Sequence, residues 1–340
     1  MRGPSALLLL AAGWVGTLPL AGGAAAQPQR WYRGNLHAHT NRASPDVVAG
    51  WYRDHGYQFV ALTDIHRLTP VETLNGLLGS PDRFLVLPGV ELSQEVDGGI
   101  VDVVGLGVAT AVGPQDGETV ADVVTADAAA VRAAGGVPIA AHPNLTWAVA
   151  AEDLIAADGF ALLEIWNAEP GMHNLGGGGS PSTEQIWDRV LSTGRRLYGV
   201  AVDDSHHFDR FGPEWANPGR AWVMVRADRL DAETLLAALE DGDFYASTGV
   251  WLLDLESDEE GIRLRLDEEN DQVEWLEPGR NPTRFRTVFV GRDGEVLKVD
   301  ESLEPSYAFR GDELYVRARV EDSTGAVAWI QPVFPRRAED

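Results

Sequence analysis

Short apolar segments alternate with amphipathic segments from residue 31 to about residue 248. Seven of the apolar segments have the length and composition of strands, at residues 32–36, 59–63, 84–90, 101–106, 137–141, 162–166 and 198–202. Strands that alternate with helices usually lie in a mostly parallel sheet, because each helix returns the chain to the start of the next strand. The pattern therefore predicts an α/β fold for this part of the chain.

Local signals mark where helices begin and end between these strands. Ser44-Pro45-Asp46 has the residues of an N-cap followed by proline in the first turn, and Gly56 supplies a left-handed stop. Residues 69–72 predict a second helix start with a capping box. A third helix is expected over residues 119–134, where a pair of glycines follows.

The pattern changes after Gly249 to segments that alternate residue by residue, at 252–255, 262–266, 286–290, 296–299 and 314–320. Residues 292–294 and 322–325 have the composition of hairpin turns. We therefore predict an α/β barrel over residues 27–249 and a small antiparallel β module over residues 250–340.

The first 26 residues have the features of a secretory signal peptide. Met1-Arg2-Gly3 precedes an apolar stretch, and Ala24-Ala25-Ala26 precedes the expected cleavage point. A membrane anchor is the alternative, but glycine, threonine and proline interrupt the apolar run short of the roughly 20 residues that a span needs. We therefore expect a periplasmic or extracellular protein without a stable membrane anchor.

Composition limits the partners and the chemistry. The formal net charge is −25, so the chain lacks a basic footprint for nucleic acid and has no electrostatic attraction to anionic lipid. It contains no cysteine, which excludes disulfides, thiolate ligands and a thiol nucleophile. Nitrogen and oxygen atoms must therefore hold any metal.

Side chains that can bind metals follow the ends of the apolar segments. His37 and His39 lie two residues apart, and on a strand such residues point the same way. The other side chains in comparable positions are Asp64, His66, Glu91, His142, Asp204 and His206. The carboxyl ends of parallel strands share one face, so these groups should converge there. Imidazoles and carboxylates suit zinc, manganese or iron, and a water that bridges two such ions becomes a nucleophile near neutral pH.

This ordered set resembles the PHP (polymerase and histidinol phosphatase) superfamily, in particular its secreted, carbaryl-hydrolase-like branch. The shared motifs are His-x-His at His37, Thr-Asp before His66, Gly-Val-Glu at Glu91, His-Pro at His142 and Asp-x-His at Asp204. The resemblance implies a distorted seven-stranded barrel, two or three divalent metal ions (Mn, Zn or Fe), and hydrolysis of phosphate esters or related bonds.

The resemblance also implies roles for the individual ligands. The first metal site would consist of His37, His39, Glu91 and Asp204, with Glu91 bridging to a second ion. His142 and His206 would complete the set of ligands.

Two departures from the family pattern concern the ligands. The Ser-Asp-Gly that usually follows the first motif is missing, because residues 41–44 read Asn-Arg-Ala-Ser. In the second motif Ile65 stands where the family has histidine, and the histidine follows one residue later as His66. We expect His66 to bind metal despite this offset; a partly dismantled second site is the alternative.

Further residues are candidates for catalysis and substrate binding. Asp64 is expected to act as a general base or to hydrogen-bond a ligand, with neither role preferred, and Asp204 and His206 are the other catalytic candidates. Asp203 and His207 are expected to orient the ligands. The substrate candidates are Arg67 and Arg210, which would clamp an anionic group or form surface salt bridges, and Asn167, which should face the pocket.

The leading functional hypothesis is a secreted metal-dependent hydrolase of small phosphoesters, in which a metal-bridging hydroxide attacks the substrate. Hydrolysis of a carboxylic or carbamic ester at the same site is the alternative. An amidohydrolase site bridged by a carbamylated lysine is excluded, because the single lysine, Lys298, lies in the predicted β module. A secreted binding protein that has lost catalysis is the alternative of another class. The oligomeric state stays open.

Overall fold

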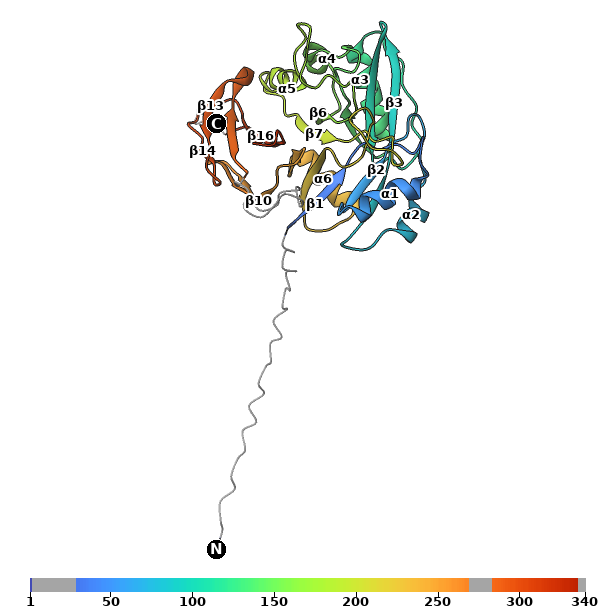
Figure 1. The fold of residues 1–340 in the computed structure, drawn as a ribbon, viewed down its shortest axis with the longest axis horizontal. Coiled ribbons are helices and arrows are strands. Elements are labelled where there is room, and N and C mark those ends of the chain that lie inside the picture. Colours follow the sequence, from blue (N-terminus) through green and yellow to red (C-terminus); the bar gives the residue numbers. More distant parts are fainter. Residues whose placement is uncertain (2–28, 269–282, 336–340) are drawn as a thin grey trace.

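The computed structural model describes Met1, residues 29–268 and residues 283–335 (Figure 1). The predicted signal peptide, apart from Met1, lies outside the described residues and stays a prediction. Within residues 29–268 and 283–335, no helix is long and apolar enough to cross a membrane.

Seven strands, close to the seven predicted segments, form a distorted barrel beside the C-terminal strands (Figure 1). They are β1 (Arg30–Asn35), β2 (Phe59–Leu62), β3 (Leu85–Val96), β4 (Gly99–Leu106), β5 (Val137–Ala140), β6 (Leu162–Asn167) and β7 (Tyr198–Val202). Consecutive strands are neighbours in the sheet. The predicted α/β barrel is therefore confirmed.

The barrel is mostly parallel, with one reversed strand. Neighbours among β1, β2 and β3 are parallel, as are those among β5, β6 and β7, whereas β4 runs antiparallel to both β3 and β5. A parallel bridge between Ala38 and Ser205 joins the segments that follow β1 and β7, and the His39 N–H donates to the Ser205 carbonyl at 2.9 Å. The rim where the parallel strands end is therefore closed.

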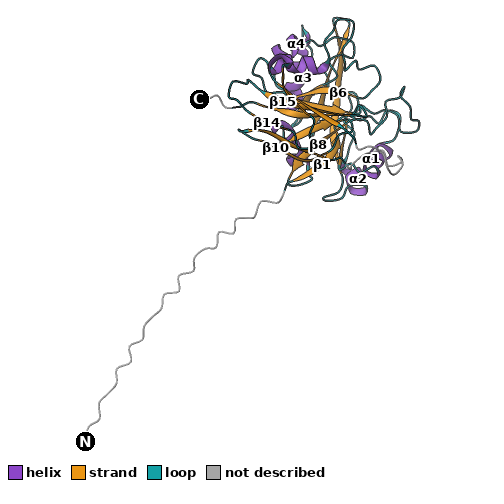
Figure 2. Cartoon of the chain, turned by 60° about the vertical axis from the view of Figure 1, so that its left-hand side comes forward, coloured by secondary structure: helices purple, strands orange, loops and turns teal. Residues whose placement is uncertain are grey.

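The helices lie outside the strands (Figure 2). They are α1 (Pro45–Asp54), α2 (Glu72–Leu77), α3 (Val120–Ala133), α4 (Ala151–Ala156), α5 (Thr183–Leu191) and α6 (Ala232–Asp241). The third predicted helix is confirmed as α3, with a capping box between Thr119 and Asp122. Ser44 occupies the N-cap position of α1, but its side chain makes no capping hydrogen bond.

The predicted capping box at residues 69–72 is wrong. The N-cap position of α2 is Val71, and no side chain caps this helix. Thr69 instead donates its hydroxyl to Asp64 at 2.5 Å. The threonine therefore satisfies a buried carboxylate rather than a helix end.

The strands after Gly249 are antiparallel, as predicted, but their main sheet continues that of the barrel through β8 (Trp222–Ala227) and β9 (Phe244–Ser247), which lie within the range predicted for the barrel. β8 pairs with β1, β9 pairs with β8, and β16 (Val327–Val333) pairs with β9. The sheet then runs through β15 (Val316–Asp322), β12 (Phe285–Val290) and β13 (Val296–Asp300), and the short 3₁₀ helix Arg292–Gly294 joins the last two. A separate sheet contains β10 (Leu252–Ser257), β11 (Gly261–Leu266) and β14 (Ser306–Ala308).

Buried polar contacts fasten the C-terminal strands to the barrel. Arg317 on β15 donates from Nε and Nη2 to the carboxylate of Asp188 on α5, at 2.7 Å each. The side-chain amide of Gln331 on β16 exchanges two hydrogen bonds of 2.8 Å with the backbone of Gly199 on β7. The position of the C-terminal strands relative to the barrel is therefore well defined.

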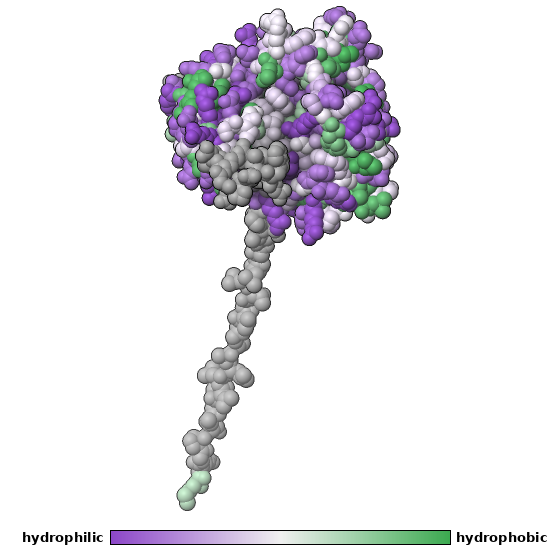
Figure 3. All heavy atoms as spheres, in the orientation of Figure 1, coloured by the Kyte–Doolittle hydropathy of each residue, from purple (hydrophilic) through white to green (hydrophobic). Residues whose placement is uncertain are grey.

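The face of the molecule shown in Figure 3 is predominantly hydrophilic. Hydrophilic side chains cover most of the face shown in Figure 3, and the hydrophobic ones are dispersed among them. The largest side chains that are fully buried include Trp187, Trp222 and Trp329. This distribution agrees with the excess of acidic residues in the sequence.

Candidate metal centre

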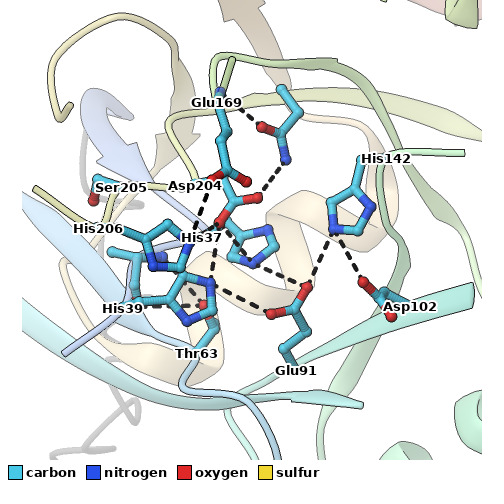
Figure 4. Close-up of polar contacts among 12 residues, drawn as sticks. His37, His39, Thr63, Glu91, Asp102, His142, Glu169, Asp204, Ser205 and His206 are labelled. Carbon is cyan, nitrogen blue, oxygen red and sulfur yellow. Dashed lines mark hydrogen bonds and ion pairs between the residues drawn. The ribbon is translucent and has the colours of Figure 1, made fainter. Parts of the chain in front are cut away.

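Imidazoles and carboxylates converge inside the closed rim of the barrel (Figure 4). His37 and His39 follow β1, Glu91 lies within β3, His142 follows β5, and Asp204 follows β7. Each of these five residues is at most 5% exposed. Strand ends far apart in the sequence therefore bring five of the predicted ligands together.

Glu91 lies between the imidazoles. Its Oε1 is 3.5 Å from His37 Nε2 and 3.2 Å from His142 Nε2, while its Oε2 is 3.4 Å from His39 Nε2. The two oxygens of this carboxylate thus face different histidines. Such a position suits a carboxylate that reaches two ions.

Asp204 forms the opposite side of the cluster. Its Oδ1 is 3.0 Å from His39 Nε2, 3.4 Å from His37 Nε2 and 3.4 Å from His206 Nε2. Its backbone has a φ of 48°, a left-handed conformation that a residue other than glycine adopts at a cost. The turn after β7 therefore holds this carboxylate in a strained conformation that aims it at the histidines.

Four overlapping triads have ligand atoms within 4.8 Å of one another. They are His37–His39–Glu91, His39–Asp204–His206, Glu91–Asp102–His142 and His37–His142–Asp204. Every predicted metal ligand except His66 belongs to at least one of them.

Unpartnered buried atoms test whether these residues fit a metal. His37 Nε2, His39 Nε2 and Asp204 Oδ1 are all buried and lack a hydrogen-bond partner. Buried polar atoms are normally satisfied, and leaving one unpaired costs free energy. Divalent cations between these atoms would satisfy them, and a set of imidazole and carboxylate donors suits zinc, manganese or iron. The residues therefore fit divalent metal ions.

Glu164, on β6, orients several of these groups through hydrogen bonds. Fully buried, it accepts hydrogen bonds from His37 Nδ1 at 2.8 Å, from the His142 N–H at 3.0 Å and from Asn167 Nδ2 at 3.0 Å. Placing the His37 proton on Nδ1 leaves the lone pair of Nε2 directed into the cluster. Asn167 also donates to Asp204 Oδ2 at 3.0 Å, so it supports a ligand, and it also lines a cavity beside the cluster.

Sequence reasoning missed Asp102, Glu164 and Glu169. Asp102 Oδ2 lies 3.5 Å from His142 Nε2, and Glu169 Oε1 lies 3.9 Å from His206 Nε2. A signal was present for Asp102 and Glu164, because each is a single carboxylate inside an apolar strand segment, where a charged residue needs a partner. Glu169 lies beyond the end of β6, and no comparable signal marks it.

Burial and neighbouring charges shift the pKa values of several titratable groups in the cluster. Burial alone would lower the pKa of His142, but the hydrogen bond to Glu91 and the nearby carboxylates outweigh it and raise the value to about 10. Burial raises the pKa of Asp102 to about 7. Burial and the charge of Asp204 raise the pKa of Glu169 to about 8. Cations in the cluster would compete with these protons, so metal binding should release protons.

Asp64 and Arg67 lie outside the four triads. Asp64 accepts hydrogen bonds from the N–H and hydroxyl of Thr40, at 2.6 Å each, and from Arg67 at 2.8 Å, in addition to the one from Thr69. Despite the opposing effect of burial, these hydrogen bonds lower the pKa of the Asp64 carboxyl. Both carboxylate oxygens of Asp64 are therefore engaged in local hydrogen bonds, one of them from Arg67, while its backbone carbonyl accepts from the Glu91 N–H at 3.3 Å.

His66 also lies apart from the cluster. Ile65 forms an isolated bridge with Glu91, and the His66 N–H donates to the Glu91 carbonyl at 2.8 Å. The imidazole is exposed, and its Nε2 lies 2.7 Å from the Ser93 carbonyl oxygen. The one-residue offset thus places the ring beside the backbone of β3, away from the triads.

The remaining candidates surround the turn after β7. Arg210 is exposed, pairs with Asp209 at 3.4 Å and lies over the ring of Trp215. Asp203 accepts from the Tyr52 hydroxyl at 2.8 Å and from three backbone N–H groups of residues 219–221, so it holds that segment rather than a ligand imidazole. His207 is buried, and both its ring nitrogens lack hydrogen-bond partners.

No family model and no curated protein matches the sequence. A two-domain protein from Bacteroides vulgatus, described as containing a predicted PHP-like metal-dependent phosphoesterase, is similar in structure with 12% identity and a TM-score of 0.46, over 86% of this chain and 90% of that one. An amidohydrolase from Chromobacterium violaceum, solved with sulfate and without metal, is similar with 14% identity and a TM-score of 0.35, over 54% and 93%.

Proposed function

We propose that this protein is a metal-dependent hydrolase that acts on phosphate esters. The observation that carries the proposal is the convergence of His37 Nε2, His39 Nε2 and Asp204 Oδ1, which are buried without partners beside Glu91. Buried polar atoms in a structural core are normally hydrogen-bonded, and these three are not. Divalent ions bound between them would satisfy all three.

Two or three ions of manganese, zinc or iron would be held by the triads described above. Such ions act as Lewis acids, lower the pKa of water and stabilise charge that develops on oxygen. Glu91 belongs to two triads and would serve two ions. Glu164 keeps His37 Nε2 free for coordination by holding its other nitrogen.

The partly exposed edge of the cluster is where a substrate would enter. His206 and Glu169 have side chains that are 14% and 29% exposed, whereas His37 and His39 are almost fully buried. His206 Nδ1 lies 3.1 Å from Asn41 Oδ1, which leaves Nε2 facing Asp204. His206 and Glu169 would therefore meet the substrate first, while the deeper ligands stay shielded from water.

A phosphoester is favoured because a cluster with several divalent ions can bind both the attacking and the leaving oxygen at phosphorus. A carboxylic or carbamic ester is the second candidate, since a net charge of −25 provides no long-range attraction for an anionic substrate. Secretion after cleavage at Ala26 and membership of the carbaryl-hydrolase-like branch are parts of this proposal that rest on the sequence motifs.

Metal content is the decisive measurement. The mature protein, purified without chelator, should contain two or three divalent ions per chain by elemental mass spectrometry. Glu91→Gln should lose at least one of them, because its carboxylate is shared between triads. Glu95→Gln, an exposed change on the same strand, should keep the full content.

Hydrolysis assays distinguish a phosphoesterase from a carboxylic ester hydrolase. Phenyl phosphate and phenyl acetate should be offered to the metal-loaded protein, and we expect phosphate release that a chelator abolishes and added manganese or zinc restores. Acetate release alone would favour the carboxylic ester hypothesis. One ion or none after reconstitution, without turnover of either ester, would contradict the enzyme and support a binding protein.

A further inference from the structure

A cavity of about 530 Å³ lies beside the metal centre, between the barrel and the C-terminal strands. Asn167, Glu169 and Arg220 line it from the barrel, and Thr248, Thr324 and Gly325 line it from β9 and the turn between β15 and β16. Its volume is within the usual range for sites that bind small molecules.

The barrel side of this cavity touches the candidate ligands. Asn167 donates to Asp204 at 3.0 Å, and Glu169 lies 3.9 Å from His206. Figure 4 shows Glu169 beside Asp204, on the side of the cluster away from Glu91. The cavity therefore adjoins the edge where a substrate would reach the ligands.

Arg220 gives the cavity wall a cationic group. Its Nη2 donates to the Gly212 carbonyl at 2.5 Å and to Asn217 Oδ1 at 2.9 Å, and both acceptors are neutral. Among the described residues no carboxylate forms an ion pair with it, although the chain has 52 acidic residues against 27 basic ones. An arginine fork that lacks an anionic partner is suited to binding a carboxylate or a phosphate.

The backbone that carries Arg220 is fixed by the turn that supplies a ligand. The N–H of Arg220 donates to Asp203 Oδ1 at 2.7 Å, and the N–H of Gly219 donates to Asp203 Oδ2 at 2.7 Å. Asp203 directly precedes Asp204 in the sequence. The position of the Arg220 backbone is therefore coupled to the turn that carries Asp204.

The opposite wall is also preformed. Thr248 exchanges backbone and side-chain hydrogen bonds with Val327 at 2.8 and 2.9 Å, which ties β9 to the start of β16. The N–H and hydroxyl of Thr324 donate to Asp322 Oδ1 at 2.8 and 2.7 Å, which holds the turn. A ligand in the cavity would therefore bind without ordering these segments.

We propose that Arg220 binds a second anionic group of the substrate, a carboxylate or a phosphate, while the ester to be cleaved lies at the metal centre. The turn at Thr324 and Gly325 lines the cavity beside the part of the substrate between the two. This inference rests on the proposed function and adds the substrate class: esters that carry a second negative charge. Arg220 then orients the substrate, because the anionic group turns toward the arginine.

Binding of two phosphonates to the metal-loaded full chain tests the proposal without requiring turnover. 4-Phosphonobenzoate carries the additional carboxylate, and phenylphosphonate lacks it. By isothermal titration calorimetry we expect the carboxylated compound to bind the wild type about tenfold more tightly. In Arg220→Gln the two Kd values should become similar, and Arg220→Lys should keep part of the preference because it keeps the charge.

Two controls separate a local effect from a change of net charge or of fold. Arg229→Gln, an exposed change in the loop before α6, removes the same charge and should keep the wild-type preference. Thr324→Glu places a negative charge on the opposite wall and should weaken binding of 4-phosphonobenzoate only, whereas Thr324→Gln should not.

A wild-type protein without preference, or an Arg220→Gln variant that keeps it, would overturn the proposal. Failure of the proposed function has a different signature: neither phosphonate binds to the metal-loaded protein and phenyl phosphate is not hydrolysed, which would overturn both.

Discussion

Glu164 illustrates how much of the site depends on residues behind the ligands. It receives hydrogen bonds from His37, from the backbone of His142 and from Asn167, which in turn holds Asp204. One buried carboxylate thus orients three candidate ligands. Partners of this kind usually tune metal affinity rather than determine whether a metal binds at all.

Glu164→Gln should therefore weaken metal binding by about 10- to 100-fold without removing any ligand. The amide keeps the shape of the side chain but loses the charge that holds the Nδ1 proton of His37. Dialysis against graded concentrations of chelator, followed by metal analysis, measures the change. Glu152→Gln, an exposed change on α4, should behave like the wild type, and unchanged retention in Glu164→Gln would contradict the assigned role.

A second prediction at the residue scale concerns Asp127 on α3. The side chain is fully buried and accepts hydrogen bonds from the Gln115 N–H at 2.7 Å and from Gln94 at 2.9 Å. Burial raises its pKa from 3.8 to about 6. Between about pH 4 and pH 6 the folded state therefore holds more protons than the unfolded chain, so stability decreases as the pH rises through this range.

Compared with Asp127→Asn, the wild type should lose on the order of 3 kcal/mol of unfolding free energy between pH 4 and pH 7. Urea unfolding of both proteins across this range gives the difference, and the variant corrects for all other titrating groups. If the unfolding free energies of the two proteins changed with pH in parallel, Asp127 would have an ordinary pKa.

The residues predicted from the sequence were those that stand where an apolar segment ends. His37, His39, Glu91, His142, Asp204 and His206 all meet in the cluster. His66 and Asp64 do not, because a single-residue offset and a set of local hydrogen bonds redirect their side chains. Sequence position alone cannot resolve such differences, since they depend on the backbone of neighbouring strands.

At the scale of elements, alternation of apolar and amphipathic segments located the seven barrel strands but not all of their directions. The connection between β3 and β4 is short, with only two residues between Val96 and Gly99, and a connection of this length allows only antiparallel pairing. The reversal brings Asp102 toward His142 from a strand that runs the other way. The sequence prediction ended the third strand at residue 90 and began the fourth at residue 101, so the short connection became visible only in the structure.

The docking of β15 on α5 provides a test at this scale. Arg317 is 2% exposed, and its charge is balanced by Asp188, which also accepts from the Tyr315 hydroxyl at 2.9 Å. Asp188→Asn leaves a buried guanidinium without its counter-charge and should cost about 3–5 kcal/mol of unfolding free energy. Urea unfolding of the wild type and of Asp188→Asn measures this loss of unfolding free energy.

Asp293→Asn, an exposed change in the nearby 3₁₀ helix, should alter stability by less than about 0.5 kcal/mol. Replacing both partners, as Asp188→Leu with Arg317→Met, should recover much of the loss, because neither charge is then buried alone. If the single and double variants are equally unstable, packing at this site matters more than charge.

At the scale of the whole molecule, the net charge of −25 repels anionic ligands over long distances. Salt screens this repulsion, with a Debye length that shrinks from about 30 Å at 0.01 M to about 8 Å at 0.15 M. The association rate of an anionic ligand should therefore increase with ionic strength over this range.

Stopped-flow binding of 4-phosphonobenzoate to the metal-loaded protein, at several concentrations of sodium chloride, measures the effect. Benzamide, which is uncharged, controls for other effects of salt on the protein. An association rate that decreases with salt would show that the bound metals and Arg220 dominate the field at the entrance.

The pairing of β9 with β16 is the feature of the whole molecule that the sequence did not reveal. The local pattern identified an antiparallel C-terminal module, but it contained no information on which barrel strand that module would join. Tyr245, Ala246 and Ser247 pair with residues 328–330, far away along the chain. Such long-range pairing depends on packing between segments that are distant in the sequence.

This pairing has a consequence for the order in which the protein is made. All the ligands in the four triads precede residue 207, whereas the strand that covers β9 begins at Val327. A growing chain therefore contains its full ligand set long before the backbone N–H and C=O groups of β9 acquire their permanent partners. During that interval β9 is an open edge that a second unfinished chain can join, so a ribosome that stalls after the barrel has been synthesised leaves a product prone to aggregation.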